Sequence, residues 1–200
     1  MNSERVIIVH GFGGHRWLMA PLARRLRQSG FATTNWGYHS FFGDIETHAA
    51  RLRRELLRQA AAADTSSLHI VAHSMGSLIV RQALLEAPLE KLQRIVLLCP
   101  PNRGAHAATR FAKNLGRLSR TLAQLSDAPD GFAATLPQTL CQHYPVAIIA
   151  AQRDFVVALD STYLPGAQRH SVIPGLHSSM LFSPTTAALT TAFLRDQPWQ

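Results

Sequence analysis

Cysteine is scarce in this 200-residue chain, and long hydrophobic runs are missing from it. The two cysteines, Cys99 and Cys141, fit a reduced compartment, and Cys99 is predicted to be a small buried residue at a strand end. No apolar run approaches the ~18–20 residues that a membrane-spanning helix needs. The first predicted strand begins at Val6, which leaves no room for a secretory signal, so we expect a cytoplasmic location.

Acidic residues are also few. Against 20 Lys and Arg there are only 12 Asp and Glu, which gives a formal net charge of +8. Nucleic-acid binding is one interpretation of this excess. However, the basic residues are spread over several predicted helices, and no recognition motif accompanies them. A solvated surface without a nucleic-acid partner is therefore favoured. The chain is 46% hydrophobic and 16% charged, which is typical of a globular protein, and we expect one domain over residues 1–200.

Short apolar runs alternate with helical patterns along the whole chain. The predicted strands are Val6–Val9, Ala32–Trp36, Leu68–Ala72, Arg94–Leu98, Val146–Ala150 and His170–Ile173. The predicted helices are Leu18–Gln28, Ile45–Ala62, Ser77–Glu86, Ala105–Leu125 and Thr185–Leu194. Such alternation is typical of βαβ units with right-handed crossovers. It predicts an α/β fold in which a parallel sheet is covered by helices on both faces.

One strand-to-helix turn carries a serine between small residues. Residues Ala72–Gly76 read AHSMG, which is the nucleophile-elbow pattern G-x-S-x-G with alanine for the first glycine. The small residues allow the strand and helix backbones to approach closely, and the sharp turn lifts the hydroxyl of Ser74 clear of the sheet. The motif makes a serine hydrolase the leading interpretation.

A serine nucleophile needs a histidine base and a carboxylate that orients the base. In the chain order Ser…Asp/Glu…His, the acid follows a later strand and the histidine a strand later still. Asp154 comes directly after the fifth predicted strand, with Asp160 as the alternative acid further along the loop. His177 lies in a polar turn just past the last predicted strand and is the predicted base. The other histidines are scattered and do not indicate a metal site.

The first predicted strand ends in a glycine-rich turn, His10–Gly14. Such a turn can present backbone N–H groups to a phosphate, but Arg16 stands where the dinucleotide pattern G-x-G-x-x-G needs its last glycine. We therefore interpret the turn as half of an oxyanion hole. The N–H of Phe12 and that of Met75, the residue after the serine, are the predicted donors.

The longest connection runs from Pro100 to Gln142, and we expect it to border the active site, because ligands bind beyond the carboxyl ends of such strands. Its predicted helix is amphipathic, with apolar and basic residues on different faces. The basic residues are Arg110, Lys113, Arg117 and Arg120. This helix can be an ordinary crossover helix packed on the sheet, or a segment that shapes the acyl pocket and makes weak contact with an anionic lipid surface. The following stretch, Ser126–Gln138, is predicted to be irregular loop.

With these motifs, the chain resembles the α/β-hydrolase superfamily, in particular its small bacterial lipases and esterases. The matching segments are Val9–Gly14, Val71–Ser77, Cys99–Gly104, Arg153–Val157 and Leu164–Phe182. The resemblance implies Ser74, Asp154 and His177 as the triad, with Phe12 and Met75 as oxyanion donors. The chain lacks the two N-terminal antiparallel strands of the full fold and a large cap domain, as in minimal lipases. The implied strand order is then 2-1-3-4-5-6 within a three-layer sandwich.

The sequence therefore predicts a carboxylic-ester hydrolase that acts on a small-molecule acyl ester through an acyl-enzyme on Ser74, with no cofactor. A thioesterase or an acyltransferase that uses the same triad remains an alternative. A hydrolase-fold binding protein without turnover is the least favoured interpretation, because the triad residues and both glycine-rich turns are present.

Overall fold

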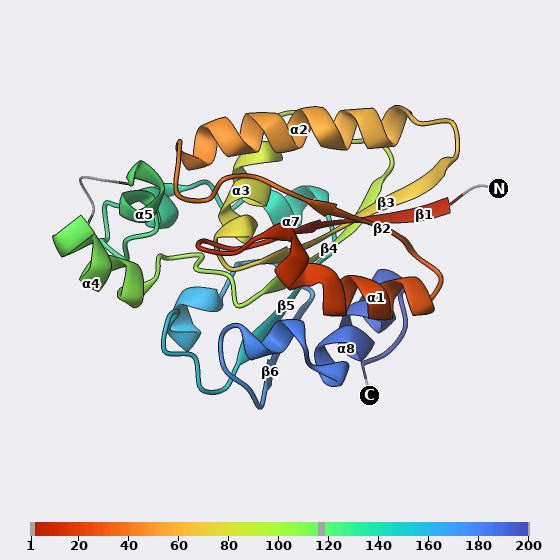
Figure 1. The fold of residues 1–200 in the computed structure, drawn as a ribbon. Coiled ribbons are helices and arrows are strands. Elements are labelled where there is room, and N and C mark those ends of the chain that lie inside the picture. Colours follow the sequence, from red (N-terminus) through yellow and green to blue (C-terminus); the bar gives the residue numbers. More distant parts are fainter. Residues whose placement is uncertain (1–2, 116–118, 200) are drawn as a thin grey trace.

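A computed structural model describes residues 3–115 and 119–199, and its centre is a six-stranded parallel sheet (Figure 1). The strands are β1 Ser3–Val9, β2 Ala32–Trp36, β3 Thr65–His73, β4 Leu92–Leu98, β5 Val146–Ala151 and β6 Arg169–Ile173. Their order across the sheet is β2-β1-β3-β4-β5-β6, and every neighbouring pair is parallel. The predicted α/β fold and strand order are confirmed.

Helices cover both faces of this sheet and make the fold a three-layer sandwich. The helices α1 Ala20–Gln28 and α8 Pro184–Leu194 lie on one face, and α2 Ile45–Ala61 and α3 Met75–Ala83 on the other (Figure 1). Within the described residues, no helix is long and apolar enough to cross a membrane.

The central strands are apolar at successive positions because both of their faces are covered. In β1, Ile7 and Val9 pack into the core beneath α2 and α3, while Val6 and Ile8 pack into the core beneath α1 and α8. All four side chains are fully buried. A strand that is buried on both faces shows a continuous apolar run instead of alternation, which is the pattern that predicted these strands.

The connection between β4 and β5 differs from the prediction. Instead of one helix over Ala105–Leu125, the structure has α4 His106–Leu115 and α5 Arg120–Gln124. Ser119 is extended, with φ −140° and ψ 108°, and its hydroxyl accepts a hydrogen bond from the N–H of Leu122 at 3.3 Å, so it caps a new helix. The stretch predicted to be irregular also contains the short helix α6 Phe132–Thr135, and α7 Leu140–His143 follows it.

Three 3₁₀ helices complete the described secondary structure: η1 Arg16–Met19, η2 Leu159–Thr162 and η3 Ser179–Leu181. The first of them occupies the beginning of the predicted helix Leu18–Gln28, whose α-helical part is α1. The helix predicted over Ser77–Glu86 begins earlier, at Met75, directly after Ser74. This earlier start places the N-terminus of α3 against the serine.

Candidate active site

Ser74 lies on a strained turn between β3 and α3. Its φ is 53° and its ψ is −126°, a backbone conformation that residues other than glycine rarely adopt. A Cβ at Gly76 would lie 2.7 Å from the carbonyl oxygen of His10, and a Cβ at Gly11 would lie 2.8 Å from the Cβ of Ser74. Both positions therefore need glycine, because the β1 turn, the serine and the start of α3 are in direct contact.

Asp154 and His177 come together from two different loops at the carboxyl end of the sheet. The Asp154 Oδ2 atom lies 2.7 Å from the Nδ1 of His177, and both side chains are nearly buried. The other carboxylate oxygen, Oδ1, accepts hydrogen bonds from the N–H groups of Val156 at 2.8 Å and Val157 at 2.9 Å. The carboxylate is thus fixed by its own loop and faces the imidazole.

The surroundings of Asp154 keep it ionised. Burial by itself raises the pKa of this carboxyl, but the hydrogen bonds from His177 and from two backbone N–H groups outweigh burial and lower its pKa below the ordinary value. An ionised carboxylate at Nδ1 keeps the proton on that nitrogen and leaves Nε2 free to accept a proton.

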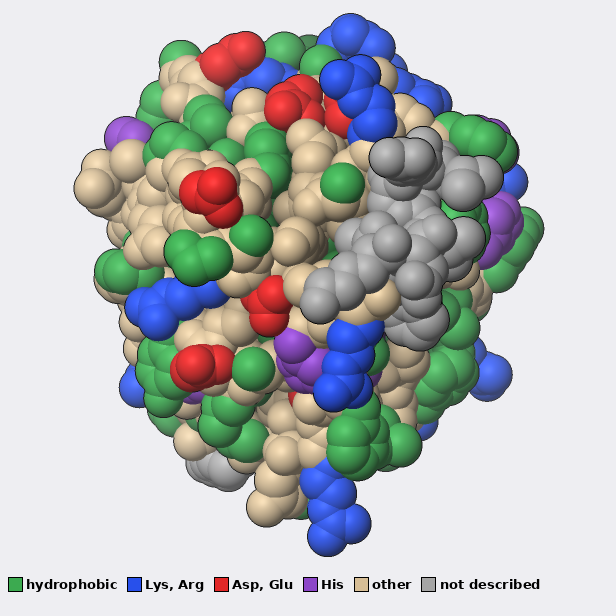
Figure 2. Space-filling model, turned by 90° about the vertical axis from the view of Figure 1, so that its left-hand side faces the viewer, with side chains coloured by type: hydrophobic (Ala, Val, Ile, Leu, Met, Phe, Trp, Pro, Cys, Tyr) green, Lys and Arg blue, Asp and Glu red, His purple; other side chains and the backbone are tan. Residues whose placement is uncertain are grey.

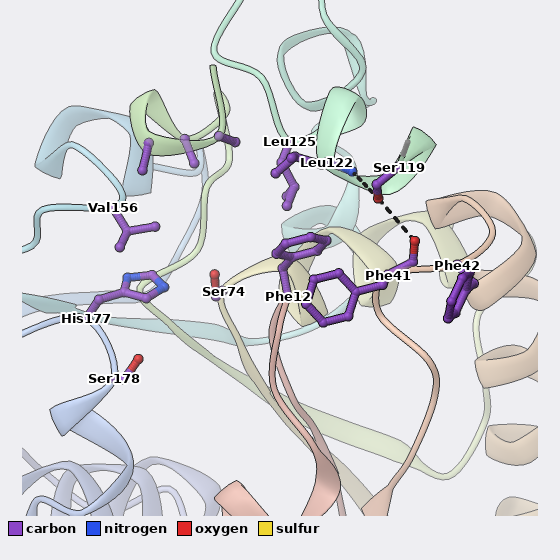
Figure 3. Close-up of a pocket in the computed structure, with 13 residues that line it drawn as sticks. Phe12, Phe41, Phe42, Ser74, Ser119, Leu122, Leu125, Val156, His177 and Ser178 are labelled. Atoms are coloured by element: carbon purple, nitrogen blue, oxygen red, sulfur yellow. Dashed lines mark hydrogen bonds between the residues drawn. The ribbon is translucent and has the colours of Figure 1, made fainter. Parts of the chain in front are cut away.

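The side chains of Ser74 and His177 line one cavity of about 710 Å³, and Figure 3 shows Ser74 between His177 on one side and Phe12 and Phe41 on the other. In the part of the chain that the structure describes, no hydrogen bond joins the Ser74 hydroxyl to His177. Catalytic hydrogen bonds of this type often form only with substrate bound.

The cavity is apolar. Its lining consists of small and apolar residues together with three serines and one histidine: Phe12, Phe41, Phe42, Ser74, Ala105, Ala107, Ala108, Ser119, Leu122, Leu125, Val156, His177 and Ser178. None of these lining residues is acidic, lysine or arginine. The β4–β5 connection supplies six of them, from Ala105 to Leu125.

The two predicted oxyanion donors lie beside the serine. Phe12 lines the cavity, and the Met75 N–H belongs to the first residue of α3, where a helix offers no internal acceptor. The Gly11–Gly14 turn is held by the next loop, because the N–H of Gly13 donates to Ser40 Oγ at 3.0 Å and the hydroxyl of Tyr38 donates to the His10 carbonyl at 2.7 Å. No sequence pattern indicated these two supports.

Two segments that are far apart in sequence, α5 and the loop before α2, are joined beside the cavity. The hydroxyl of Ser119 donates to the Phe41 carbonyl at 3.2 Å, as Figure 3 shows, and that of Thr121 donates to the Gly43 carbonyl at 3.0 Å. The Ile45 N–H donates to the side-chain oxygen of Gln124 at 2.7 Å. These bonds attach α5 to the loop before α2. Sequence reasoning missed Phe41 and Phe42 as lining residues, since that loop carries no motif.

Two further possibilities are Asp160 as the acid and a metal ion held near His177. Asp160 is exposed on η2 and has no hydrogen bond to His177 within the described residues. Cys99, Asp154 and His177 form the one described cluster with ligand atoms close enough for a metal ion. Burial, and the negative charge of Asp154, raise the pKa of the Cys99 thiol far above its ordinary value. A thiol that stays protonated is a poor metal ligand, and the other two groups already bind each other.

A family model matches most of the chain. The model described as serine aminopeptidase, S33, matches residues 2–163 of this chain. The chain belongs to this family. It is an α/β-hydrolase, as the resemblance predicted. The matched range includes Ser74 and Asp154 and ends before His177. No curated protein matches the sequence.

Solved structures share the fold of this α/β-hydrolase at low sequence identity. The mature lipase BlEst2 of Bacillus licheniformis is similar with a TM-score of 0.81 and 16% identity, over 96% of this chain and 92% of that one. This chain spans 50% of the propeptide form of the same lipase. The phospholipase PlaB of Legionella pneumophila gives a TM-score of 0.72 at 15% identity, over 99% and 58% of the chains. The esterase Pf2001 of Pyrococcus furiosus gives 0.68 at 16% identity, over 98% and 84%.

Proposed function

We propose that this α/β-hydrolase cleaves carboxylic esters of apolar acyl groups through an acyl-enzyme on Ser74. The observation that carries the proposal is the Asp154–His177 hydrogen bond of 2.7 Å beside a serine on a strained turn, with the serine and the histidine lining one apolar cavity. That combination supplies a nucleophile, a base and a carboxylate that orients the base. The lipases and esterases among the similar structures support the same reaction class.

The reaction begins when the Ser74 oxygen attacks the acyl carbonyl while His177 Nε2 takes the hydroxyl proton. The oxyanion that forms accepts hydrogen bonds from the Phe12 and Met75 N–H groups, and Asp154 stabilises the imidazolium. The C–O bond to the leaving alcohol then breaks as His177 returns the proton to that oxygen. Water then attacks the acyl carbon while His177 takes its proton. The bond between that carbon and the Ser74 oxygen breaks as His177 returns the proton to the serine, and the acid leaves.

The cavity favours an apolar acyl group over an amino-terminal peptide. An aminopeptidase substrate carries an α-ammonium group, which needs a nearby carboxylate or other acceptors when it leaves water. No acidic residue lines the cavity among the described residues. The side chains of Phe12, Phe41 and Leu122 instead provide an apolar wall on the side of Ser74 away from His177 (Figure 3). We place the acyl chain against this wall and the leaving group beside His177, which must protonate it.

A hydrolysis profile over p-nitrophenyl esters from acetate to dodecanoate tests the substrate class. We expect kcat/KM to rise with chain length up to about octanoate, because each buried methylene contributes about 0.8 kcal/mol to binding. Replacing Leu122 with tryptophan fills the cavity and is expected to lower kcat/KM for octanoate while acetate hydrolysis is retained. The matched control is Leu85→Trp, a change at an exposed position outside the cavity lining. A profile that falls steadily from acetate contradicts the proposed acyl site.

Contact with an anionic lipid surface stays a prediction, as does the cytoplasmic location. Of the basic residues that motivate the lipid contact, Arg110 and Arg120 belong to the described residues. Arg120 is exposed at the start of α5. The side chain of Lys113 and residue Arg117 lie outside the described residues. On the face shown in Figure 2, basic and acidic side chains are mixed and do not gather into one basic patch. This mixture does not favour a nucleic-acid partner on that face.

A further inference from the structure

A second histidine, His73, packs against the ring of His177, the candidate base. His73 is the last residue of β3 and directly precedes Ser74, and its side chain is buried. The His73 and His177 rings lie with centroids 4.8 Å apart and planes inclined by 51°. His73 does not line the substrate cavity. It is therefore placed to act on the base and not on the substrate.

The hydrogen bond of His73 has only one possible direction. Its Nε2 lies 3.1 Å from the carbonyl oxygen of His177. A carbonyl oxygen only accepts, so Nε2 carries a proton and donates it. Burial and the nearby His177 lower the pKa of His73 to about 3, which keeps the ring neutral and its Nδ1 unprotonated near neutral pH. The Nδ1 side faces Gly11, where an added Cβ would lie 3.2 Å from that nitrogen.

This bond connects the loop of the base to the strand of the nucleophile. The turn that carries His177 has an internal hydrogen bond, from the Leu176 N–H to Ser179 Oγ at 2.8 Å. The loop after β5 also binds it, because the Arg153 N–H donates to the Gly175 carbonyl at 3.1 Å. Between residues 174–179 and β3, the described residues form no other hydrogen bond. Asp154 therefore holds the imidazole of the base, and His73 holds its backbone.

We propose that His73 is a positioning residue that fixes His177 at the correct distance from Ser74 through the Nε2–H bond to the His177 carbonyl. The inference rests on the proposed function. Because the bond joins the segments of the base and the nucleophile, its loss changes the distance over which the serine proton is transferred. An error of about 1 Å in such a geometry lowers a rate by about a hundredfold. Substrate binding is little affected, since the apolar wall of Phe12, Phe41 and Leu122 is unchanged.

The test measures kcat and KM for an octanoate ester with His73→Leu and His73→Gln. Leucine removes the donor, and we expect kcat to fall about ten- to a hundredfold with KM changed by less than about twofold. Glutamine can place an amide N–H near the position of Nε2, so it is expected to recover much of the lost kcat. Circular dichroism and a thermal unfolding curve establish that each variant is folded.

His69→Leu is the matched control, because His69 is a buried histidine on the same strand whose ring nitrogens have no hydrogen-bond partner in the described structure. A folded His73→Leu protein with the parental kcat, or an equal loss in His69→Leu, overturns the inference. If His73→Leu does not fold, Gln is compared with the shorter Asn, and equal kcat values for the two overturn it as well. Failure of the proposed function itself is recognised separately, by turnover that persists in Ser74→Ala.

Discussion

The geometry of single residues favours Asp154 over Asp160 as the carboxylate partner of His177. Asp154 uses one oxygen for His177 and the other for two backbone N–H groups, whereas Asp160 is exposed on η2. We predict that Asp154→Asn lowers kcat by about 10³–10⁴-fold, because an amide cannot hold the required tautomer or stabilise the imidazolium. Asp160→Asn, the matched control, is expected to change kcat by less than about twofold. Steady-state kinetics on a soluble ester checks both, and the reverse ranking would make Asp160 the acid.

The sequence predicted the candidate site residues at strand ends and missed those that support them. Ser74, Asp154 and His177 each follow a strand, so chain order and residue type were sufficient to select them. Tyr38 and Ser40 lie in a loop without a motif, and their contribution is one hydrogen bond each to the glycine-rich turn. Such bonds depend on how two loops meet, and no local pattern in the sequence records that.

Among the elements, α3 and the β4–β5 connection are joined by a buried arginine. The guanidinium of Arg81 donates to the carbonyl and side-chain oxygens of Asn102 and to the carbonyls of Leu136 and Pro137, at 2.8–3.3 Å. Burial lowers its pKa to about 10, so it remains charged near neutral pH. The helix that begins directly after Ser74 is thereby attached to both ends of the connection.

We predict that Arg81→Met lowers the free energy of unfolding by about 2–4 kcal/mol, because buried carbonyl oxygens lose their donors. Urea unfolding of the variant measures this, with Arg51→Met as the control. Arg51 is exposed on α2, and its replacement is expected to change the free energy of unfolding by less than about 0.5 kcal/mol. A loss in Arg81→Met no larger than in the control would contradict a structural role for the buried guanidinium.

Element order was largely predictable, and element boundaries in the connection were not. The alternation of apolar runs and helical patterns identified all six strands, although the edge strands β2 and β6 are only partly buried. The single helix expected over Ala105–Leu125 is two helices, because the Ser119 hydroxyl caps a new one while also donating to the Phe41 carbonyl. A tertiary contact thus helps to set where α5 begins, and the amphipathic period of the sequence alone does not indicate this helix boundary.

The stability of the whole molecule is expected to fall in mild acid. Burial, together with nearby Arg94, lowers the pKa of His69 to about 4, against about 6.5 in the unfolded chain. The unfolded state therefore binds more protons between these values, and the free energy of unfolding decreases as the pH falls from about 6.5 to about 4. For His69 alone the decrease is about 3 kcal/mol.

Urea unfolding at pH 7, 5.5 and 4.5 measures this decrease, and His69→Leu should make the pH dependence shallower. His73, with a pKa of about 3, retains a similar effect in that variant, so some dependence is expected to remain. An identical pH dependence in parent and His69→Leu would show that protonation of His69 does not limit the acid stability.

The most direct test of the central claim is the turnover of a p-nitrophenyl ester by Ser74→Ala, measured beside the parent protein. The account predicts a folded protein whose kcat is lower by several orders of magnitude, about 10⁴-fold or more, because no other hydroxyl occupies the strained turn. Folding is verified by an unfolding curve like that of the parent. Near-parental turnover by folded Ser74→Ala would contradict the serine-hydrolase function.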